Sequence, residues 1–249
     1  MASVTPLLVT RSLTRQFGGL TAVDHVDFEL PAGEIRAIIG PNGAGKTTFV
    51  SLVCGRIQPT SGQILFDGDD ITRLPAHERV KRGIAYTFQI TSIFPNLTVF
   101  DNVALSVQRN LMDKGGRISA RELEAGVAQA LARVHLTDRV DMTAGKLAYG
   151  HQRLLEVAMG LALKPRLLIL DEPTQGLSDA EIESFIALVK EIADSATVLL
   201  IEHNMPVVMA LAHRITVMSN GAPLAEGTPA EIRANAAVQQ AYLGSTENV

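Results

Sequence analysis

Residues 40–48 read Gly-Pro-Asn-Gly-Ala-Gly-Lys-Thr-Thr, and this stretch decides how the rest of the chain is interpreted. It fits the pattern G-x-x-x-x-G-K-[ST] of a phosphate-binding loop. The apolar run Ile35–Ile39 before it predicts a buried strand, and Thr47–Val53 after it predicts the start of a helix. A glycine-rich turn that matched by chance would not also stand between a strand and a helix. The sequence therefore predicts a strand–loop–helix unit that binds phosphate.

The residue types in this loop each have a chemical use. Gly40, Gly43 and Gly45 lack Cβ atoms, so backbone N–H groups can turn inward towards phosphate oxygens. Lys46 is expected to reach the β- and γ-phosphates, and the Thr47 hydroxyl is expected to ligate Mg²⁺. The helix N-terminus adds positive potential beneath the phosphates. The same predicted site includes the other loop residues, Pro41, Asn42, Ala44 and Thr48.

Composition limits the classes of protein to which the chain can belong. Its 249 residues, 47% of them hydrophobic, can form one domain, or one domain with a subdomain. The formal net charge of −4 provides no basic field, so no nucleic-acid partner is expected. Cys54 is the single cysteine and is expected to be a small buried residue, which fits a cytosolic location. No apolar run approaches the ~20 residues of a membrane-spanning helix, and the N-terminus does not resemble a secretion signal. Any membrane role must then come through a partner.

Two carboxylates follow a second predicted strand. Leu167–Leu170 is a continuous apolar run, and Asp171 and Glu172 come directly after it. Because ligands of parallel sheets bind at the carboxyl ends of the strands, both side chains are expected at such a site. Asp171 would hold Mg²⁺, directly or through water, and Glu172 would orient or deprotonate the water that attacks the phosphoryl group. The alternative is that both cap a helix that begins at Pro173, and the phosphate-binding loop argues against it.

Two further polar residues stand at the ends of predicted strands. His203 follows Thr197–Ile201, where it can contact the γ-phosphate or the attacking water. A lone histidine after a strand is more often a surface residue, but the shared sheet edge favours a catalytic contact. Gln89 follows Ile84–Thr87, and its amide could complete the metal shell or touch the water. With Glu172, these two residues form the predicted catalytic set.

The rest of the chain predicts an α/β fold with two additions. Leu7–Phe17 and Ala22–Leu30 alternate apolar and polar residues, which predicts an antiparallel hairpin. Residues from roughly 90 to 165 are nearly all helical by pattern and lie between strands. The remaining strands and helices alternate, which implies a mostly parallel sheet covered by helices. The expected strands cover 63–66, 84–87, 167–170, 197–201 and 215–218, and the expected helices cover 75–82, 98–107, 121–134, 150–163, 179–194 and 205–212.

In their order along the chain, these features resemble the ATP-binding subunit of an ABC transporter. The matching residues are the phosphate-binding loop, Gln89, Leu147-Ala148-Tyr149-Gly150-His151-Gln152, the carboxylate pair, Gly176-Leu177-Ser178-Asp179 and His203. The resemblance covers nearly the whole chain. It implies a P-loop NTPase fold in one domain of residues 1–249, with an antiparallel β-subdomain and an inserted helical subdomain at roughly 90–165. It also implies ATP and Mg²⁺ as ligands, and ATP hydrolysis coupled to transport.

The resemblance further implies a head-to-tail dimer, although it does not decide between two copies of this chain and a different partner. Each ATP would lie between the phosphate-binding loop of one chain and the signature residues of the other, which are Ala148, Tyr149, Gly150 and His151. The helix that begins at Gly150 would aim its N–H groups at the γ-phosphate. The family usually has serine where Ala148 stands, so a hydroxyl contact is absent and weaker ATP-driven dimerisation is expected.

Phe17 matches the position of the aromatic residue that stacks on adenine in this family. The alternative is a core aromatic at the end of a strand.

The apolar connector 90–100 corresponds to the region bordering the groove that receives the membrane subunits. Ile93, Phe94 and Leu97 are expected to make that contact, because exposed apolar patches commonly mark interfaces. The alternative is packing within the helical subdomain.

Several segments resemble importer subunits for branched-chain amino acids, or for related small polar solutes such as urea and amides. They are residues 15–23, 149–153, 201–205, 225–229 and 241–244. Such importers imply transmembrane permease subunits, a second ATPase subunit and, indirectly, a solute-binding protein, with this chain peripheral at the cytoplasmic face of the membrane. The ATPase never touches the solute, so its sequence does not identify it.

Other functions compete with import. A related subunit with a similar tail serves the export of lipopolysaccharide-type lipids, and this alternative stays open. Soluble ATPases of DNA repair or translation share the core, but they generally join two nucleotide-binding units or insert a long coiled coil, and 249 residues contain neither. A P-loop GTPase would carry the guanine-reading pattern Asn-Lys-x-Asp, which the sequence lacks.

Overall fold

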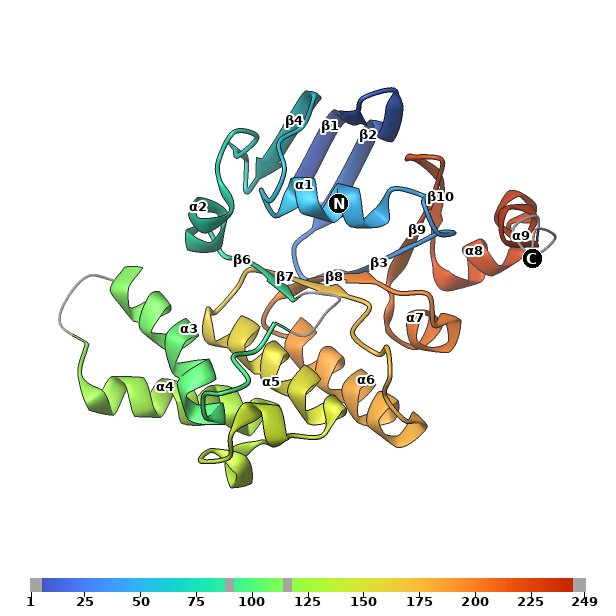
Figure 1. The fold of residues 1–249 in the computed structure, drawn as a ribbon. Coiled ribbons are helices and arrows are strands. Elements are labelled where there is room, and N and C mark those ends of the chain that lie inside the picture. The colour runs from blue at the N-terminus through green and yellow to red at the C-terminus, as the bar shows by residue number, and fades with distance from the viewer. Residues whose placement is uncertain (1–5, 88–91, 114–117, 244–249) are drawn as a thin grey trace.

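The computed structural model describes residues 6–87, 92–113 and 118–243 (Figure 1). The strands of its central sheet are β3 (Ile35–Ile39), β6 (Ile84–Thr87), β7 (Leu167–Asp171), β8 (Thr197–Ile201), β9 (Arg214–Ser219) and β10 (Ala222–Gly227). They lie in the order β10-β9-β3-β8-β7-β6. All neighbours pair in parallel except β10, which is antiparallel to β9. The prediction of a mostly parallel sheet is confirmed.

Two of the hydrophobic cores among the described residues lie on opposite faces of the central sheet. Successive residues of a strand face opposite sides of its sheet, so neighbouring side chains of β7 enter different cores. Ile169 packs in the core that contains α1 (Lys46–Val53), whereas Leu168 packs in the core that contains α5 (Tyr149–Ala162) and α6 (Asp179–Ala193). Figure 1 shows α1 on one side of the sheet and α5 and α6 on the other. Burial on both faces explains why these strands read as continuous apolar runs.

A second sheet is antiparallel and lies on the same side as α1 (Figure 1). Its strands are β1 (Pro6–Phe17), β2 (Leu20–Pro31), β4 (Ser61–Phe66) and the short β5 (Asp69–Asp70). β1 and β2 form the predicted hairpin, and β4 pairs with the other edge of β1. Phe28 of β2 meets Phe49 of α1 edge to face, with ring centroids 5.3 Å apart. This aromatic contact fastens the second sheet to the helix that follows the phosphate-binding loop.

Three helices occupy most of the region that was predicted to be helical, and they pack together in Figure 1. They are α3 (Val99–Asp113), α4 (Ala120–Arg133) and α5, with short 3₁₀ turns at Thr137–Arg139 and Ala144–Lys146. α3 extends beyond its predicted end at Val107, because Leu111 also packs against the core. Ser119 and Glu122 form a capping box at the start of α4. Lys114-Gly115-Gly116, which interrupts the helical pattern of the sequence between α3 and α4, lies outside the described residues.

Other elements refine the sequence predictions. Helix α6 begins at Asp179 behind Ser178, which caps it with Glu181, so the alternative of a helix that begins at Pro173 is wrong. Cys54, which the sequence pattern places on the helix after the loop, is instead the residue that follows α1, and it is buried as expected. The predicted helices at 75–82 and 205–212 are α2 (Ala76–Lys81) and α7 (Met205–Leu211). The C-terminal helices α8 (Pro229–Ala234) and α9 (Ala236–Leu243) were not predicted.

Arg79 of α2 is fully buried and ties three segments to one another. Its guanidinium donates to the carbonyl oxygens of Leu52 and Val53 at the end of α1, at 2.6 and 2.8 Å, and to those of Thr72 and Leu74, both at 3.0 Å. Burial lowers the pKa of Arg79 to about 10, so it remains charged at neutral pH. Because Arg79 is fully buried, water could not reach these carbonyl oxygens to replace its guanidinium as their hydrogen-bond donor.

Replacing Arg79 by methionine should therefore destabilise the fold. The variant leaves several buried carbonyls without a donor, and we expect the free energy of unfolding to fall by about 3 kcal/mol. Urea unfolding followed by circular dichroism measures the change. Arg82→Met, at an exposed position on the same segment, is the matched control and should change stability by less than about 0.5 kcal/mol. Equal effects of the two substitutions would contradict the role of Arg79.

Candidate active site

The predicted phosphate-binding loop joins β3 to α1 and lies against two other strands. Gly40, Gly43 and Gly45 all have positive φ angles, of 151°, 79° and 96°. A Cβ atom at Gly40 would lie 2.2 Å from the carbonyl oxygen of Met218, and one at Gly45 would lie 2.3 Å from that of Ala22. Both distances are too short for a side chain. The glycines thus allow the loop to fold tightly at the edge where β3 and β9 end.

Lys46, the first residue of α1, closes back over this loop. Its Nζ donates to the carbonyl oxygens of Gly40 and Pro41, at 2.7 and 3.0 Å. Burial lowers the pKa of Lys46, and the nearby carboxylates of Glu172 and Asp171 partly oppose that shift. The first N–H groups of a helix have no acceptor within the helix, so the start of α1 and the ammonium group together suit an anion.

Asp171 ends β7 and is nearly fully buried, with 1% of its surface exposed. The Tyr86 hydroxyl on β6 donates to its Oδ2, at 2.7 Å. Its Oδ1 is buried and has no hydrogen-bond partner among the described residues. Burial raises the pKa of Asp171, the hydrogen bond from Tyr86 lowers it, and the Glu172 charge raises it. A buried carboxylate oxygen without a partner fits a hard cation such as Mg²⁺, because oxygen ligands are what that ion prefers.

Glu172 and His203 stand next to each other at this edge. The parallel register pairs Asp171 with Ile201, so the residues that follow β7 and β8 are neighbours. Glu172 has a φ of 48°, an uncommon value outside glycine that turns the chain away from the strand direction. Its Oε1 lies 3.8 Å from Nδ1 of His203. The structure therefore brings this predicted pair together beside the phosphate-binding loop.

One acidic residue at this edge was not predicted from the sequence. Glu202 is 1% exposed and accepts hydrogen bonds from Thr174 on one loop and from His203 and Asn204 on the next. A single glutamate after an apolar strand carries no pattern that distinguishes it from a surface residue. Its burial and its partners depend on the register between β7 and β8, which only the structure provides.

Phe17 stands at the end of β1 with 45% of its surface exposed, so the alternative of a core aromatic is wrong. The guanidinium carbon of Arg15 lies 4.4 Å from the centre of its ring. Arg15 also donates to the carbonyl oxygen of Gln58, at 2.9 Å, which holds the cation in place. The ring is therefore supported on one face. Gln89, the other predicted contact, lies outside the described residues.

The signature residues 148–151 do not lie at the phosphate-binding loop of their own chain. α5 covers the face of the central sheet opposite α1 (Figure 1), and no described hydrogen bond or ion pair joins residues 148–151 to residues 40–48. Helix α5 begins at Tyr149, one position before the expected Gly150, and Ala148 is its N-cap residue. His151 follows on the first turn.

The start of α5 packs instead against the first turn of α6 and the segment before it. A Cβ atom at Gly150 would lie 2.1 Å from Oε1 of Glu181, and one at Gly176 would lie 2.9 Å from Cε1 of Tyr149. The two motifs, which were predicted separately, are thus in direct contact. Tyr149 is 43% exposed at this contact.

The predicted membrane-facing residues divide into two groups. Phe94 and Leu97 are 51% and 37% exposed, whereas Ile93 packs partly against the core. Thr98, next to Leu97, forms an isolated bridge with Thr143, and Met142 lies opposite Val99, whose N–H donates to its carbonyl oxygen. Phe94 and Leu97 are thus exposed apolar side chains on the predicted connector, and for Ile93 the alternative of core packing holds in part.

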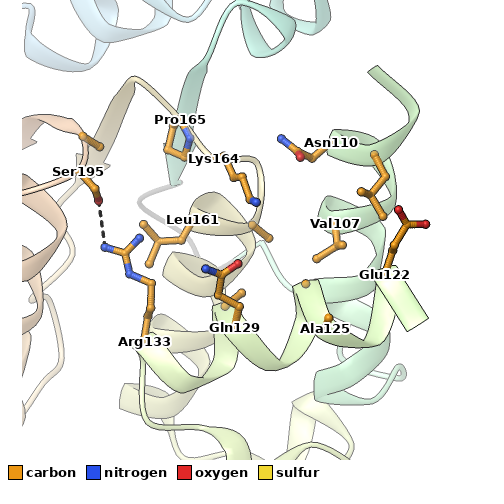
Figure 2. A pocket seen from close by; sticks show the side chains of 15 residues that line it. Val107, Asn110, Glu122, Ala125, Gln129, Arg133, Leu161, Lys164, Pro165 and Ser195 are labelled. Carbon is orange, nitrogen blue, oxygen red and sulfur yellow. Dashed lines mark hydrogen bonds between the residues drawn. The ribbon is translucent and has the colours of Figure 1, made fainter. Parts of the chain in front are cut away.

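A cavity of about 510 Å³ lies away from these residues, between α3, α4 and the turns before β7 and β8 (Figure 2). Arg133 spans one end of it and donates to the Ser195 hydroxyl, at 3.2 Å. Leu161 and Val107 line its apolar side. None of the predicted site residues line this cavity, so it takes no part in the candidate site.

Comparisons with known proteins identify the family. A family model described as "ABC transporter" matches residues 23–175, and one described as "Branched-chain amino acid ATP-binding cassette transporter" matches residues 222–248. The chain is 41% identical to the high-affinity branched-chain amino acid transport ATP-binding protein BraF of Pseudomonas aeruginosa, over 96% of this chain and 98% of that protein. It is 38% identical to the corresponding protein LivG of Escherichia coli over the same shares. The lipopolysaccharide export system ATP-binding protein LptB of Escherichia coli is 34% identical, over 95% and 97%.

A solved structure of an ATP-binding cassette of an ABC transporter, in its ADP conformation, superimposes with a TM-score of 0.85. It is 26% identical in sequence, and the match covers 96% of this chain and 99% of that one.

Tyr86→Phe should weaken the response to Mg²⁺ without weakening the nucleotide contact itself. The substitution keeps the ring but removes the donor that holds Oδ2 of Asp171. We expect the Mg²⁺ concentration for half-maximal tightening of ATP binding to rise about 3–10-fold, since a hydrogen bond of this kind contributes on the order of 1 kcal/mol. Titration with a fluorescent ATP analogue measures it. ATP affinity in EDTA should stay unchanged, and a loss there would show that Tyr86 acts on the fold instead.

Proposed function

This chain belongs to the ABC transporter family, and on that premise we propose that its ATP hydrolysis powers solute import through partner permeases. The chain is an ATPase that converts ATP and water to ADP and phosphate. One observation carries the proposal: the phosphate-binding loop, Asp171 and the pair Glu172–His203 meet at one edge of a parallel sheet. The proposed solutes are branched-chain amino acids or related small polar solutes. The identity to BraF and the family match at residues 222–248 support this choice.

We assign the roles at the nucleotide as follows. The loop residues 40–48, with Lys46, hold the phosphates, and Phe17 stacks on the adenine with Arg15 behind it. Thr47, Asp171 and Gln89 would hold Mg²⁺, and the unpartnered Oδ1 of Asp171 supports this. The metal ion, when bound, neutralises charge that develops on the transferring phosphoryl group.

Glu172 is proposed to orient or deprotonate the attacking water. Its backbone turns out of the strand, which directs the carboxylate to the loop edge, where Oε1 lies 3.8 Å from His203. His203 would contact the γ-phosphate or the same water. Little covalent chemistry is needed from the protein in phosphoryl transfer, so positions and charges of these groups account for the catalysis.

The family works as dimers, and we propose a head-to-tail dimer with a second ATPase subunit. Ala148, Tyr149, Gly150 and His151 lie away from the loop of their own chain, so they can complete an ATP site only in a partner. The free N–H groups at the start of α5 would then face the γ-phosphate. Ala148 brings no hydroxyl, so backbone groups carry this contact.

We also propose that the exposed side chains of Phe94 and Leu97 face the permease subunits. Their exposure supports the proposal, because exposed apolar side chains commonly mark interfaces. Within the described ranges, no helix is both long and apolar enough to cross a membrane. The proposed location is peripheral, at the cytoplasmic face, with a solute-binding protein as an indirect partner. The chain is proposed to act as one domain, with residues roughly 90–165 as its helical subdomain.

Export of a lipid is the second candidate, and the 34% identity to LptB favours it. The higher identity to BraF, together with the branched-chain family model over the last elements, favours import. A soluble role without a membrane partner has no observation of its own in its favour.

Glu172→Gln tests the assigned hydrolytic role. The amide keeps the shape but cannot accept a proton, so turnover of ATP should fall at least about 100-fold while ATP still binds. Phosphate release gives the rate, and gel filtration in ATP should show a stable dimer. Turnover close to wild type in the variant would refute the role of Glu172.

The import assignment is tested by isolating the chain in mild detergent from its native membranes. Mass spectrometry should identify two permease subunits and a second ATPase, and the associated binding protein can then be screened with leucine, isoleucine, valine and urea. Recovery of a lipid-export permease would replace import by export. Recovery of soluble partners alone would refute the transport function.

A further inference from the structure

The carboxylate of Glu202 joins two loops of the active-site edge. Its Oε1 accepts from the backbone N–H of Thr174, at 3.0 Å, and from the Thr174 hydroxyl. Its Oε2 accepts from the N–H groups of His203 and Asn204, at 3.0 and 3.1 Å. Thr174 belongs to the loop after β7 and the other two donors to the loop after β8. A carboxylate this deeply buried is costly unless donors compensate it, and here each oxygen has two.

We propose that Glu202 is a positioning residue for ATP hydrolysis, which fixes His203 relative to Glu172. It does not touch the nucleotide in this proposal. It ties the N–H of His203 to the loop that begins with Glu172, and the N–H of Glu172 itself donates to the carbonyl oxygen of Ile201, at 2.9 Å. Glu202 thus adds a side-chain connection to this backbone one, and together they hold Glu172 and His203 at 3.8 Å. The inference rests on ATP hydrolysis at this site.

A simpler role as a helix cap does not account for these contacts. Helix α7 already has a cap of its own, because the Asn204 side chain accepts from the N–H of Val207. Thr174 is not in a helix, and α6 has the separate cap of Ser178 and Glu181. The hydrogen bonds of Glu202 therefore join loops and do not terminate helices.

The loop that contains Thr174 also reaches the signature residues. It continues to Gly176, against which the Tyr149 ring packs. Glu202 thus connects His203 to the segment on which the start of α5 rests. Through these contacts, the buried carboxylate helps to position both His203 and the signature residues, which contribute to opposite sides of the proposed dimeric ATP site.

Glu202→Gln is the test, because glutamine has the same shape. In either orientation, the amide NH₂ of glutamine faces at least one backbone N–H that needs an acceptor. The hydrogen bonds to one of the two loops are therefore lost. We expect kcat for ATP to fall about 10–100-fold, while the Kd for ATP stays within about 2-fold, since misplaced catalytic groups cost rate and not binding. Glu183→Gln, at an exposed position of α6, is the matched control and should keep the wild-type kcat.

Coupling to His203 separates positioning from general stability. If Glu202 acts through His203, the double variant Glu202→Gln, His203→Ala should have the kcat of His203→Ala alone. Multiplied effects in the double variant would overturn the proposal, and so would a wild-type kcat in Glu202→Gln.

Thr174→Val keeps the test usable should Glu202→Gln fold poorly. It removes the hydroxyl donor and leaves both N–H donors to Oε2, so we expect kcat to fall about 2–5-fold, again without further loss in a His203→Ala background. An unchanged kcat in this variant would overturn the proposal. All rates are measured on the complex isolated with its permease and second ATPase subunits. A wild-type complex without ATPase activity would instead refute ATP hydrolysis at this site, and the inference with it.

Discussion

The parallel register of β3, β8 and β7 is the constraint on which the active site depends. These three strands are adjacent in the central sheet and all run the same way, so their carboxyl ends open at one edge. Groups from distant parts of the sequence meet there: the loop after Ile39, the carboxylates after Leu170 and the histidine after Ile201. A shift of one residue between β7 and β8 would move Glu172 away from His203 and turn alternate side chains into the wrong core.

Much of this edge could be predicted from the sequence, and the reason is physical. The strands are buried on both faces, so they appear as uninterrupted apolar runs, and the polar residue after each run marks where the strand ends. The Gly40–Thr48 motif then identifies which edge binds the ligand. Asp171, Glu172 and His203 could be placed by that reasoning alone, without any knowledge of their distances.

Other features could not be predicted, because they depend on contacts between segments that are far apart in the sequence. Tyr86 and Glu202 act through hydrogen bonds to neighbouring strands or loops, and their partners follow from strand order. The last helices, α8 and α9, span only six and eight residues, which is too short to show a clear helical period. The predicted start of α5 at Gly150 is one residue later than its start at Tyr149, a difference within the usual variation of helix boundaries.

The support of Phe17 by Arg15 has a consequence for nucleotide choice. The guanidinium covers one face of the ring and leaves the other for a base, so the proposed contact is a stacking interaction alone. Stacking does not read hydrogen-bonding edges, and every purine offers a similar π surface. The proposed contact with Phe17 would therefore not distinguish one purine nucleotide from another, and at this end of the site their relative supply in the cell would decide which one binds.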